Sequence, residues 1–392
     1  MPLQAQAPAN TSGPLAGLRV IEFAGIGPGP FAGMMLADMG ADVIVVERAA
    51  DAAKAAAYPR SAMSRGKRSI AVDLKSEAGR DIVWRLLASA DALIEGFRPG
   101  VMERLGFGPE QVAARNHRLV YGRITGWGQD GPLAQAAGHD INYVALSGAL
   151  STSCRPGERP SIAPTLVGDM GGGAMFLCFG LMCAIFEAQR SGRGQVVDAA
   201  MVDGISAMSG LIHQMRHIGY WQDQAEHNFF LNSAPFYEVF ECADGGQISL
   251  GAIEPQFYAE LLQRLGLDAD PKRQYDTREW PAMKARVAAQ IKTRTRADWC
   301  ARLEGSDVCF APVLSLAEAP EHPHNAARGV FVDIKVDGKP QRQPAPAPRL
   351  SRTPARRPTP GARCGEHTDE LLIALGLDSA DIKSLRDQGA CA

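Results

Sequence analysis

The sequence has few cysteines, almost no excess charge and no very long apolar run. Its eight cysteines in 392 residues include no CxxC pair, which argues against zinc ribbons, iron–sulfur sites and a disulfide framework. We therefore expect reduced thiols and a cytoplasmic protein. The 41 Lys and Arg against 43 Asp and Glu leave a net charge of −2, which is too even for a dedicated nucleic-acid binder.

Signals for secretion and for membrane insertion are also lacking. The opening residues, MPLQAQAPANTSGP, have neither the basic region nor the apolar region of a secretory signal. The longest apolar stretch, Gly171–Phe186, has 16 residues, fewer than the roughly 20 that cross a bilayer. We expect a buried core helix there, with neither a membrane nor a nucleic acid as partner.

What the sequence does contain is a regular alternation of strand-like and helical runs. Hydrophobic residues make up 46% and charged residues 21%, as in globular proteins, and the length predicts two or three domains. Leu18–Gly25, Phe31–Gly40 and Ala41–Arg48 read as strand, helix and strand, and the alternation continues to Arg118–Gly128. This pattern predicts an α/β fold with a Rossmann-like, doubly wound and mainly parallel sheet.

The second half of the chain has a different order of predicted elements. Phe236–Ala252 predicts a hairpin, and charge-rich helices follow it. Lys339–Arg363 holds seven prolines and seven basic residues, which favours an extended arm, and Glu366–Gly389 predicts two short amphipathic helices. We predict a large α/β domain over 1–225, a small α+β domain over 226–330, and over 331–392 the arm and C-terminal helices that return to the large domain.

A glycine- and proline-rich loop, Gly25–Pro30, joins the first predicted strand to the first helix. In a doubly wound fold this loop presents backbone N–H groups to a phosphate. The dinucleotide fingerprint GxGxxG fails because Pro30 stands where the third glycine belongs. A standard NAD site is therefore disfavoured, although Glu47 stands where a ribose-binding acid would, and NAD stays open as an alternative.

Basic residues cluster near the predicted strands. Arg65, Lys67 and Arg68 precede the third strand, and the others stand at or after the carboxyl end of a strand. In an open parallel sheet such residues face the ligand crevice, where they could bind a polyanion with separated phosphates, such as coenzyme A. The alternative is a solvated rim. The basic residues concerned are Arg48, Arg65, Lys67, Arg68, Lys75, Arg98 and Arg104.

Three polar residues are candidates for chemistry. His139 stands at a predicted helix start, Asp169 stands two residues before the run Gly171–Gly173, and Glu254 follows a strand and opens a helix. The alternatives are a structural histidine and two helix caps. The glycine-rich turn after Asp169 also offers N–H groups that could hold an oxyanion.

Other constellations are weaker. His213 and His217 lack the glutamate of an HExxH motif, and His322-Pro323-His324 lies in a predicted loop, so we expect no metal site. The GxSxG elbow of serine hydrolases is missing.

Segments along nearly the whole chain resemble the class III (formyl-CoA transferase-like, CaiB/BaiF) CoA-transferase superfamily, and within it the alpha-methylacyl-CoA racemases. The glycine-proline loop and GDMGGG are typical of the superfamily, whereas AGHDINY and GAIEPQFY resemble the racemase branch. The other matching segments include DLKSEAGR, IEGFRPGVMERLG, GRITGWGQDGP, GRGQVVDAAMVDG and GEHTDELLIALG.

The resemblance implies an isomerase that inverts the α-carbon of 2-methylacyl-CoA thioesters. His139 and Asp169 would be the two bases, and Glu254 would accept a hydrogen bond from the histidine. The carbonyl oxygen of the enolate would be held at the turn after Asp169. No metal or redox cofactor is implied beyond the CoA of the substrate.

The resemblance also implies where CoA binds and how chains pair. Arg48, Lys75, Arg98 and Arg104 would lie near the CoA phosphates, and Tyr143 near the pantetheine or thioester. An interlocked homodimer would bring Glu254 of one chain to His139 of the other.

The main alternative is a CoA-transferase that moves CoA between carboxylic acids with Asp169 as nucleophile. The transferase pattern usually lacks the histidine of GHD. The presence of His139 in this sequence therefore favours racemisation. A CoA-binding protein without activity is the third possibility.

Overall fold

The computed structural model describes residues 12–392, which form two compact units. Of these residues, the first unit holds those up to Ser147, together with Ala163–Met208 and Gly329–Ala392. The second unit holds Gly148–Ile162 and Ser209–Arg328. Each unit is therefore assembled from segments that are separated in the sequence.

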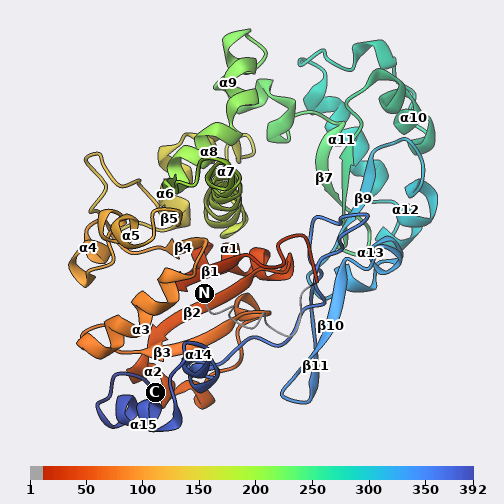
Figure 1. Ribbon diagram of the computed structural model, residues 1–392. Coiled ribbons are helices and arrows are strands. Elements are labelled where there is room, and N and C mark those ends of the chain that lie inside the picture. The colour runs from red at the N-terminus through yellow and green to blue at the C-terminus, as the bar shows by residue number, and fades with distance from the viewer. Residues whose placement is uncertain (1–11) are drawn as a thin grey trace. The chain divides into compact units, whose positions relative to one another are not determined.

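A six-stranded sheet forms the centre of the first unit (Figure 1). Its order is β3-β2-β1-β4-β5-β6, and every neighbouring pair is parallel, which confirms the predicted parallel sheet. The order reverses direction between β1 and β4, where open α/β sheets bind ligands. The strands are β1 Arg19–Phe23, β2 Asp42–Arg48, β3 Arg68–Val72, β4 Ala92–Glu95, β5 Val120–Thr125 and β6 Val196–Ala200.

Helices connect these strands, and local sequence explains where they begin. Pro28 starts α1, where its missing N–H costs nothing. The Ser76 hydroxyl accepts a hydrogen bond from the N–H of Gly79 at 3.0 Å and so caps α3. The helices of this unit are α1 Pro28–Asp38, α2 Ala49–Ala52, α3 Glu77–Ala88, α4 Val101–Leu105, α5 Pro109–Arg115, α6 Asp140–Leu146, α7 Phe176–Ser191, α8 Met201–Met208, α14 Thr368–Ala374 and α15 Ser379–Asp387.

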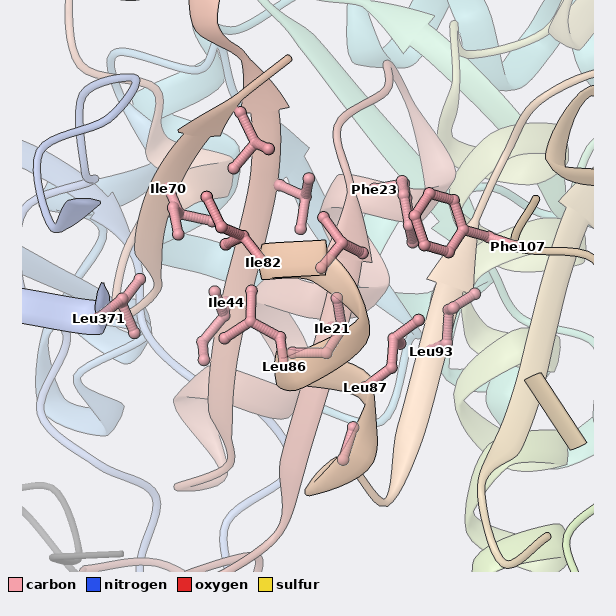
Figure 2. Close-up of a cluster of buried hydrophobic side chains, with 14 of the residues drawn as sticks. Ile21, Phe23, Ile44, Ile70, Ile82, Leu86, Leu87, Leu93, Phe107 and Leu371 are labelled. Atoms are coloured by element: carbon pink, nitrogen blue, oxygen red, sulfur yellow. The ribbon is translucent and has the colours of Figure 1, made fainter. Parts of the chain in front are cut away.

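Alternating side chains place the core on both faces of the sheet. Ile21 of β1 belongs to one buried cluster and its neighbour Val20 to the other, as the period of a strand requires. Figure 2 shows the first cluster, in which Leu86 of α3 and Leu371 of α14 pack with isoleucines of the strands. The C-terminal helices are thus part of the core of this unit.

The apolar stretch at Gly171–Phe186 lies within one continuous helix. Leu166–Met175 is a π-helix, and α7 continues it to Ser191. At 26 residues this helix is long and apolar enough to cross a membrane. Core helices of soluble proteins can have the same length and hydropathy. Leu177 and Leu181 are buried against the sheet, whereas Phe179 is exposed, so the expected core helix is buried on one face only.

The segment expected to be an extended arm begins as a strand. β11 Lys339–Pro344 pairs antiparallel with β10 Phe331–Val336, a hairpin that the prolines of the sequence obscured. Prolines occur in strands where no ladder hydrogen bond is required of them, as at sheet edges. Beyond Pro344, residues 345–363 form no helix or regular strand, as expected.

The second unit is a three-stranded antiparallel sheet with helices. β7 Tyr237–Glu241 and β8 Gln247–Gly251 form the predicted hairpin, and β9 Phe310–Val313 pairs with β8. Its core includes Phe236, Trp280 and Trp299. The helices are α9 Gly210–His217, α10 Pro255–Leu265, α11 Trp280–Ile291, α12 Arg296–Leu303 and α13 Pro323–Arg328.

Candidate active site

A cavity of about 650 Å³ lies at the carboxyl ends of β1, β4 and β5. It occupies the place where the strand order reverses, which is the ligand crevice of this kind of fold. His139 and Asp169 both line it, as does the glycine-proline loop. Its other lining residues include Gly96–Pro99, Thr125–Trp127, Tyr143, Thr165 and Met201.

His139 is held at the start of α6. Its backbone is extended, and its N–H donates to the side-chain oxygen of Asn142 at 3.1 Å. The residue is exposed rather than buried in the core. The imidazole is therefore presented on the wall of the cavity.

Asp169 lies inside the π-helix that starts at Leu166, so it is not the cap that we considered. Its N–H donates to Oδ1 of Asp140 at 2.8 Å, and the N–H of Met170 donates to the carbonyl of Thr165 at 2.9 Å. The π-helical pattern pairs the following N–H groups with carbonyls five residues earlier. The expectation that this turn offers free N–H groups to an oxyanion is therefore wrong.

The surroundings of Asp169 favour its protonated form. Burial raises the pKa of Asp169, and the nearby carboxylate of Asp140 raises it further, while His139 opposes the shift. Desolvation and a like charge both disfavour a carboxylate. The carboxyl thus titrates at a higher pH than an ordinary aspartate.

Two glycines allow backbone and carboxylates to approach one another. Gly27 adopts the left-handed conformation, with φ +69°, and a Cβ there would lie 3.3 Å from Oδ2 of Asp169. A Cβ at Gly168 would lie 2.2 Å from Oδ1 of Asp140, which no side chain could tolerate. Glycine at these positions therefore permits the close packing around Asp169.

Asp140 is a residue that the sequence analysis missed. Its carboxylate accepts from the N–H groups of both Asp169 and Thr165. The available signal was an aspartate in the first turn of a helix, which is common enough to pass for a structural feature.

Tyr143 lines the cavity, but its hydroxyl is already engaged. The ring is buried and packs edge-on against Trp127, with centroids 4.7 Å apart. The hydroxyl donates to the carbonyl of Gly138, the residue before His139. Burial raises the pKa of Tyr143, so the phenol stays neutral. The contact ties α6 to the segment that leads into His139.

The basic residues separate into two groups. Arg65, Lys67 and Arg68 form ion pairs with Asp38, Glu22 and Asp42 at 2.6, 2.6 and 2.7 Å. Arg65 and Lys67 are also buried. The interpretation of these three as binders of a polyanion is therefore wrong, because their charges are already used within the unit.

The other basic residues are more available. Arg98 lines the cavity. Lys75 and Arg104 follow strand ends outside the cavity lining, and within residues 12–392 neither makes an ion pair. Arg48 is exposed and pairs with Asp51 at 3.0 Å.

Glu47 does not present a free acid to a ribose. Its carboxylate accepts from the hydroxyl of Ser69, and burial is the main cause that raises its pKa. An NAD site is therefore disfavoured on two grounds: Glu47 is not free to bind a ribose, and Pro30 stands where the fingerprint needs its third glycine.

Glu254 occupies the N-cap position of α10 in the second unit. Its backbone is extended there, but its side chain makes no capping hydrogen bond. The residue is exposed. The interpretation of Glu254 as a helix cap is therefore wrong, and its carboxylate remains available to another group.

Metal-binding clusters do not appear in the described part of the chain. No group of three His, Cys, Asp or Glu side chains within residues 12–392 is placed to hold a metal ion. His213, His217, His322 and His324 are included in this statement.

Comparison with known proteins finds relatives along nearly the whole chain. The sequence pattern of CoA-transferase family III matches residues 15–368. A mouse (Mus musculus) protein named "Alpha-methylacyl-CoA racemase" is 43% identical over 95% of this chain and 96% of its own length. A protein of Agrobacterium fabrum named "Succinate--glutarate CoA-transferase" is 34% identical over 93% of this chain and 96% of its own length. The crystal structure of a CAIB/BAIF family protein from Brucella suis superposes with a TM-score of 0.79 and 26% identity, covering 93% of this chain and 100% of that one.

Proposed function

This chain belongs to CoA-transferase family III, and we propose that it inverts the α-carbon of 2-methylacyl-CoA thioesters. One observation carries the proposal: the imidazole of His139 and the carboxyl of Asp169 line the same cavity. The relative with 43% identity is named for this reaction, whereas the transferase is 34% identical.

Inversion requires a base on each face of the α-carbon. One base removes the proton, and the conjugate acid of the other returns a proton to the opposite face. His139 and Asp169 supply these groups, and the active pair carries a single proton. Starting from one epimer the imidazole is the base and the carboxyl the acid, and from the other epimer the roles are exchanged.

The raised pKa of Asp169 suits such a pair. An ordinary aspartic acid gives up its proton at about pH 4, and imidazoles in general do so near 6.5. Burial and Asp140 move the carboxyl toward the imidazole range, which brings the two one-proton states closer in free energy. When these two one-proton states have similar free energies, the enzyme can epimerise the substrate at comparable rates in both directions.

The CoA of the substrate supplies the only further group that this chemistry needs. Removing and returning a proton neither oxidises nor reduces the substrate, so no redox cofactor takes part. We propose that Arg98 at the cavity, with Lys75, Arg104 and Arg48 outside it, binds the phosphates by charge-assisted hydrogen bonds. Tyr143 would border the thioester end.

We further propose that Glu254 accepts a hydrogen bond from His139 of a second chain in a homodimer. A carboxylate acceptor fixes the tautomer of an imidazole and favours the imidazolium after proton uptake. The uncapped, exposed side chain of Glu254 supports this role, because its own helix does not use it.

The second candidate is CoA transfer with Asp169 as nucleophile. The same carboxylate at the same cavity would attack the thioester carbonyl and expel the CoA thiolate, which gives an anhydride between the acyl group and Asp169. The thiolate would then attack the Asp169 carbonyl, release the acyl group as a free carboxylate and leave a CoA thioester on Asp169. This reaction has no use for a base at His139.

A single experiment separates these functions. One epimer of a 2-methylacyl-CoA is incubated with the protein in deuterated water without an acceptor acid, and deuterium uptake and epimer ratio are measured. Racemisation predicts deuterium at the α-carbon together with mixing of the epimers. Unchanged substrate that passes its CoA to an added organic acid would instead establish transfer, and CoA binding with neither reaction would establish a binding protein.

A further inference from the structure

We propose that Gln274 is a positioning residue that holds the Glu254 segment in the shape needed for catalysis. The inference rests on the role proposed above for Glu254. Gln274 lies in the second unit, directly after the short helical turn Pro271–Arg273, and is 20 residues away from Glu254 in sequence. It touches neither substrate nor Glu254 itself in this proposal and acts through the backbone.

The amide of Gln274 binds the two carbonyls that precede Glu254. Its Nε2 donates to the carbonyl of Ala252 at 3.0 Å and to that of Ile253 at 2.8 Å. The side chain is buried, with 3% of its surface exposed. Both amide protons are thus committed to consecutive peptide groups of one segment, which fixes the path of the backbone into Glu254.

We call the two hydrogen bonds from Gln274 to the carbonyls of Ala252 and Ile253 the clamp, and two neighbouring side chains support it. The indole N–H of Trp280 donates to the carbonyl of Gln274 at 2.8 Å, and Trp280 itself is buried in the core. The hydroxyl of Tyr275 donates to the carbonyl of Ile253 at 2.6 Å. The carboxylate of Glu254 contributes to the raised pKa of Tyr275, behind burial, which is consistent with its lying near that phenol.

The clamp matters because Glu254 stands at the positive end of α10. Free N–H groups there attract a carboxylate, so an unrestrained glutamate would tend to turn onto its own helix. The structure holds the segment with the carboxylate exposed and no cap formed. Gln274 therefore keeps Glu254 available as an acceptor for another group.

The side-chain oxygen of Gln274 makes the test practicable. Within the described residues this buried Oε1 has no hydrogen-bond partner. Gln274→Leu keeps a similar shape, removes both donors and also removes the unpartnered oxygen. We expect the variant to fold, because the loss of two hydrogen bonds is partly offset by the removal of an unsatisfied buried atom.

The test is a double-mutant cycle on epimerisation with Gln274→Leu, Glu254→Gln and the double variant. We expect Gln274→Leu to lower kcat about ten- to hundredfold with little change in KM, as small misplacements of catalytic groups do. The double variant should be no slower than Glu254→Gln alone, because the clamp has nothing left to position. Both single variants should move the basic limb of the pH profile to lower pH, since the imidazolium loses its acceptor.

Gln343→Leu is the matched control, because Gln343 is a glutamine of similar burial in the other unit. If this control slowed epimerisation as much as Gln274→Leu, the loss would be general and the proposal would be wrong. It would also be wrong if the effects of Gln274→Leu and Glu254→Gln multiplied.

A crystal structure of Gln274→Leu gives a readout that does not depend on activity. We expect the Glu254 carboxylate to have turned onto the first N–H groups of α10. An unchanged Glu254 would overturn the positioning role, whether or not the protein is a racemase. Absence of epimerisation in the unmodified protein would overturn the proposed function instead, and the crystal structure would still decide the role of Gln274.

Discussion

The carboxylate of Asp140 accepts a hydrogen bond from the N–H of Asp169 at 2.8 Å, so the residue that follows one proposed base anchors the other. Its second oxygen accepts from the N–H of Thr165 at 3.3 Å, just before the π-helix. The segments that carry His139 and Asp169 are thereby joined through one side chain. The same charge raises the pKa of Asp169.

Asp140→Asn should therefore shift the acidic limb of the pH–rate profile to lower pH. The asparagine oxygen can still accept from the N–H of Asp169, but the like charge is gone, so the pKa of Asp169 falls. The one-proton state of the base pair then persists to lower pH. The measurement is kcat/KM for epimerisation against pH, and an acidic limb that stays in place or moves upward would contradict the role of Asp140.

His139→Ala and Asp169→Ala should each lower epimerisation by about 10²–10⁴-fold, the usual contribution of a positioned acid or base. Each variant keeps one base, which can remove a proton and return a deuteron on the same face. We therefore expect residual deuterium exchange with retention, on opposite epimers in the two variants. Mass spectrometry with chiral chromatography checks this, and intact epimerisation by His139→Ala would refute the two-base mechanism.

Lys67→Met should lower the free energy of unfolding by about 3–5 kcal/mol, because it leaves the buried Glu22 without its partner. The two side chains are 1% and 2% exposed and 2.6 Å apart. Burial already raises the pKa of Glu22, so in the variant this carboxyl binds a proton more readily when folded than when unfolded. The loss should thus be greatest at neutral pH and shrink as the pH falls.

Urea unfolding at several pH values measures this loss. The control is the double variant Glu22→Gln with Lys67→Met, which removes the unpaired charge and should recover part of the stability. A single variant as stable as the unmodified protein would show that the pair contributes nothing.

Arg98→Ala should raise KM for the acyl-CoA about ten- to hundredfold, the value of one or two hydrogen bonds to a charged group. Arg48→Ala should raise KM less than Arg98→Ala, because Arg48 lies outside the cavity lining, is exposed to solvent and would have to leave Asp51 to bind a phosphate. Steady-state kinetics with the CoA thioester and with a pantetheine thioester that lacks the nucleotide tests this difference. Equal effects of both variants on both substrates would contradict phosphate binding at Arg98.

Tyr143→Phe should reduce kcat by up to about tenfold while KM stays nearly constant, since it removes one neutral hydrogen bond. The lost bond joins the hydroxyl to the carbonyl of Gly138 and steadies the approach to His139. A direct contact between the hydroxyl and the pantetheine would instead raise KM. The ratio of the two kinetic parameters therefore separates positioning from substrate binding.

Much of the fold could be predicted because its signals are local. The elements β1, α1 and β2 are 5, 11 and 7 residues long, so a short stretch of sequence shows each of them, and Pro28 and Ser76 mark helix starts within a single turn. The hairpin β10–β11 was not predicted, because prolines generally disfavour strands and Lys339–Pro344 was therefore expected to be part of an extended arm. Only its pairing, with Lys335 opposite Pro340, shows that β11 tolerates them.

The doubly wound sheet, the glycine-proline loop and the motifs around His139 and Asp169 could be recognised from the sequence, because each depends on residues close together in the chain. Which charged side chains are available to a ligand becomes clear only from the folded chain. Lys67 and Arg98 both stand next to strands, Lys67 just before β3 and Arg98 shortly after β4, yet Lys67 pairs with Glu22, 45 residues away, while Arg98 lines the cavity. Partner choice among charges depends on contacts between distant segments, and the bond from Asp169 to Asp140, which occupies the expected oxyanion donor, is of this kind.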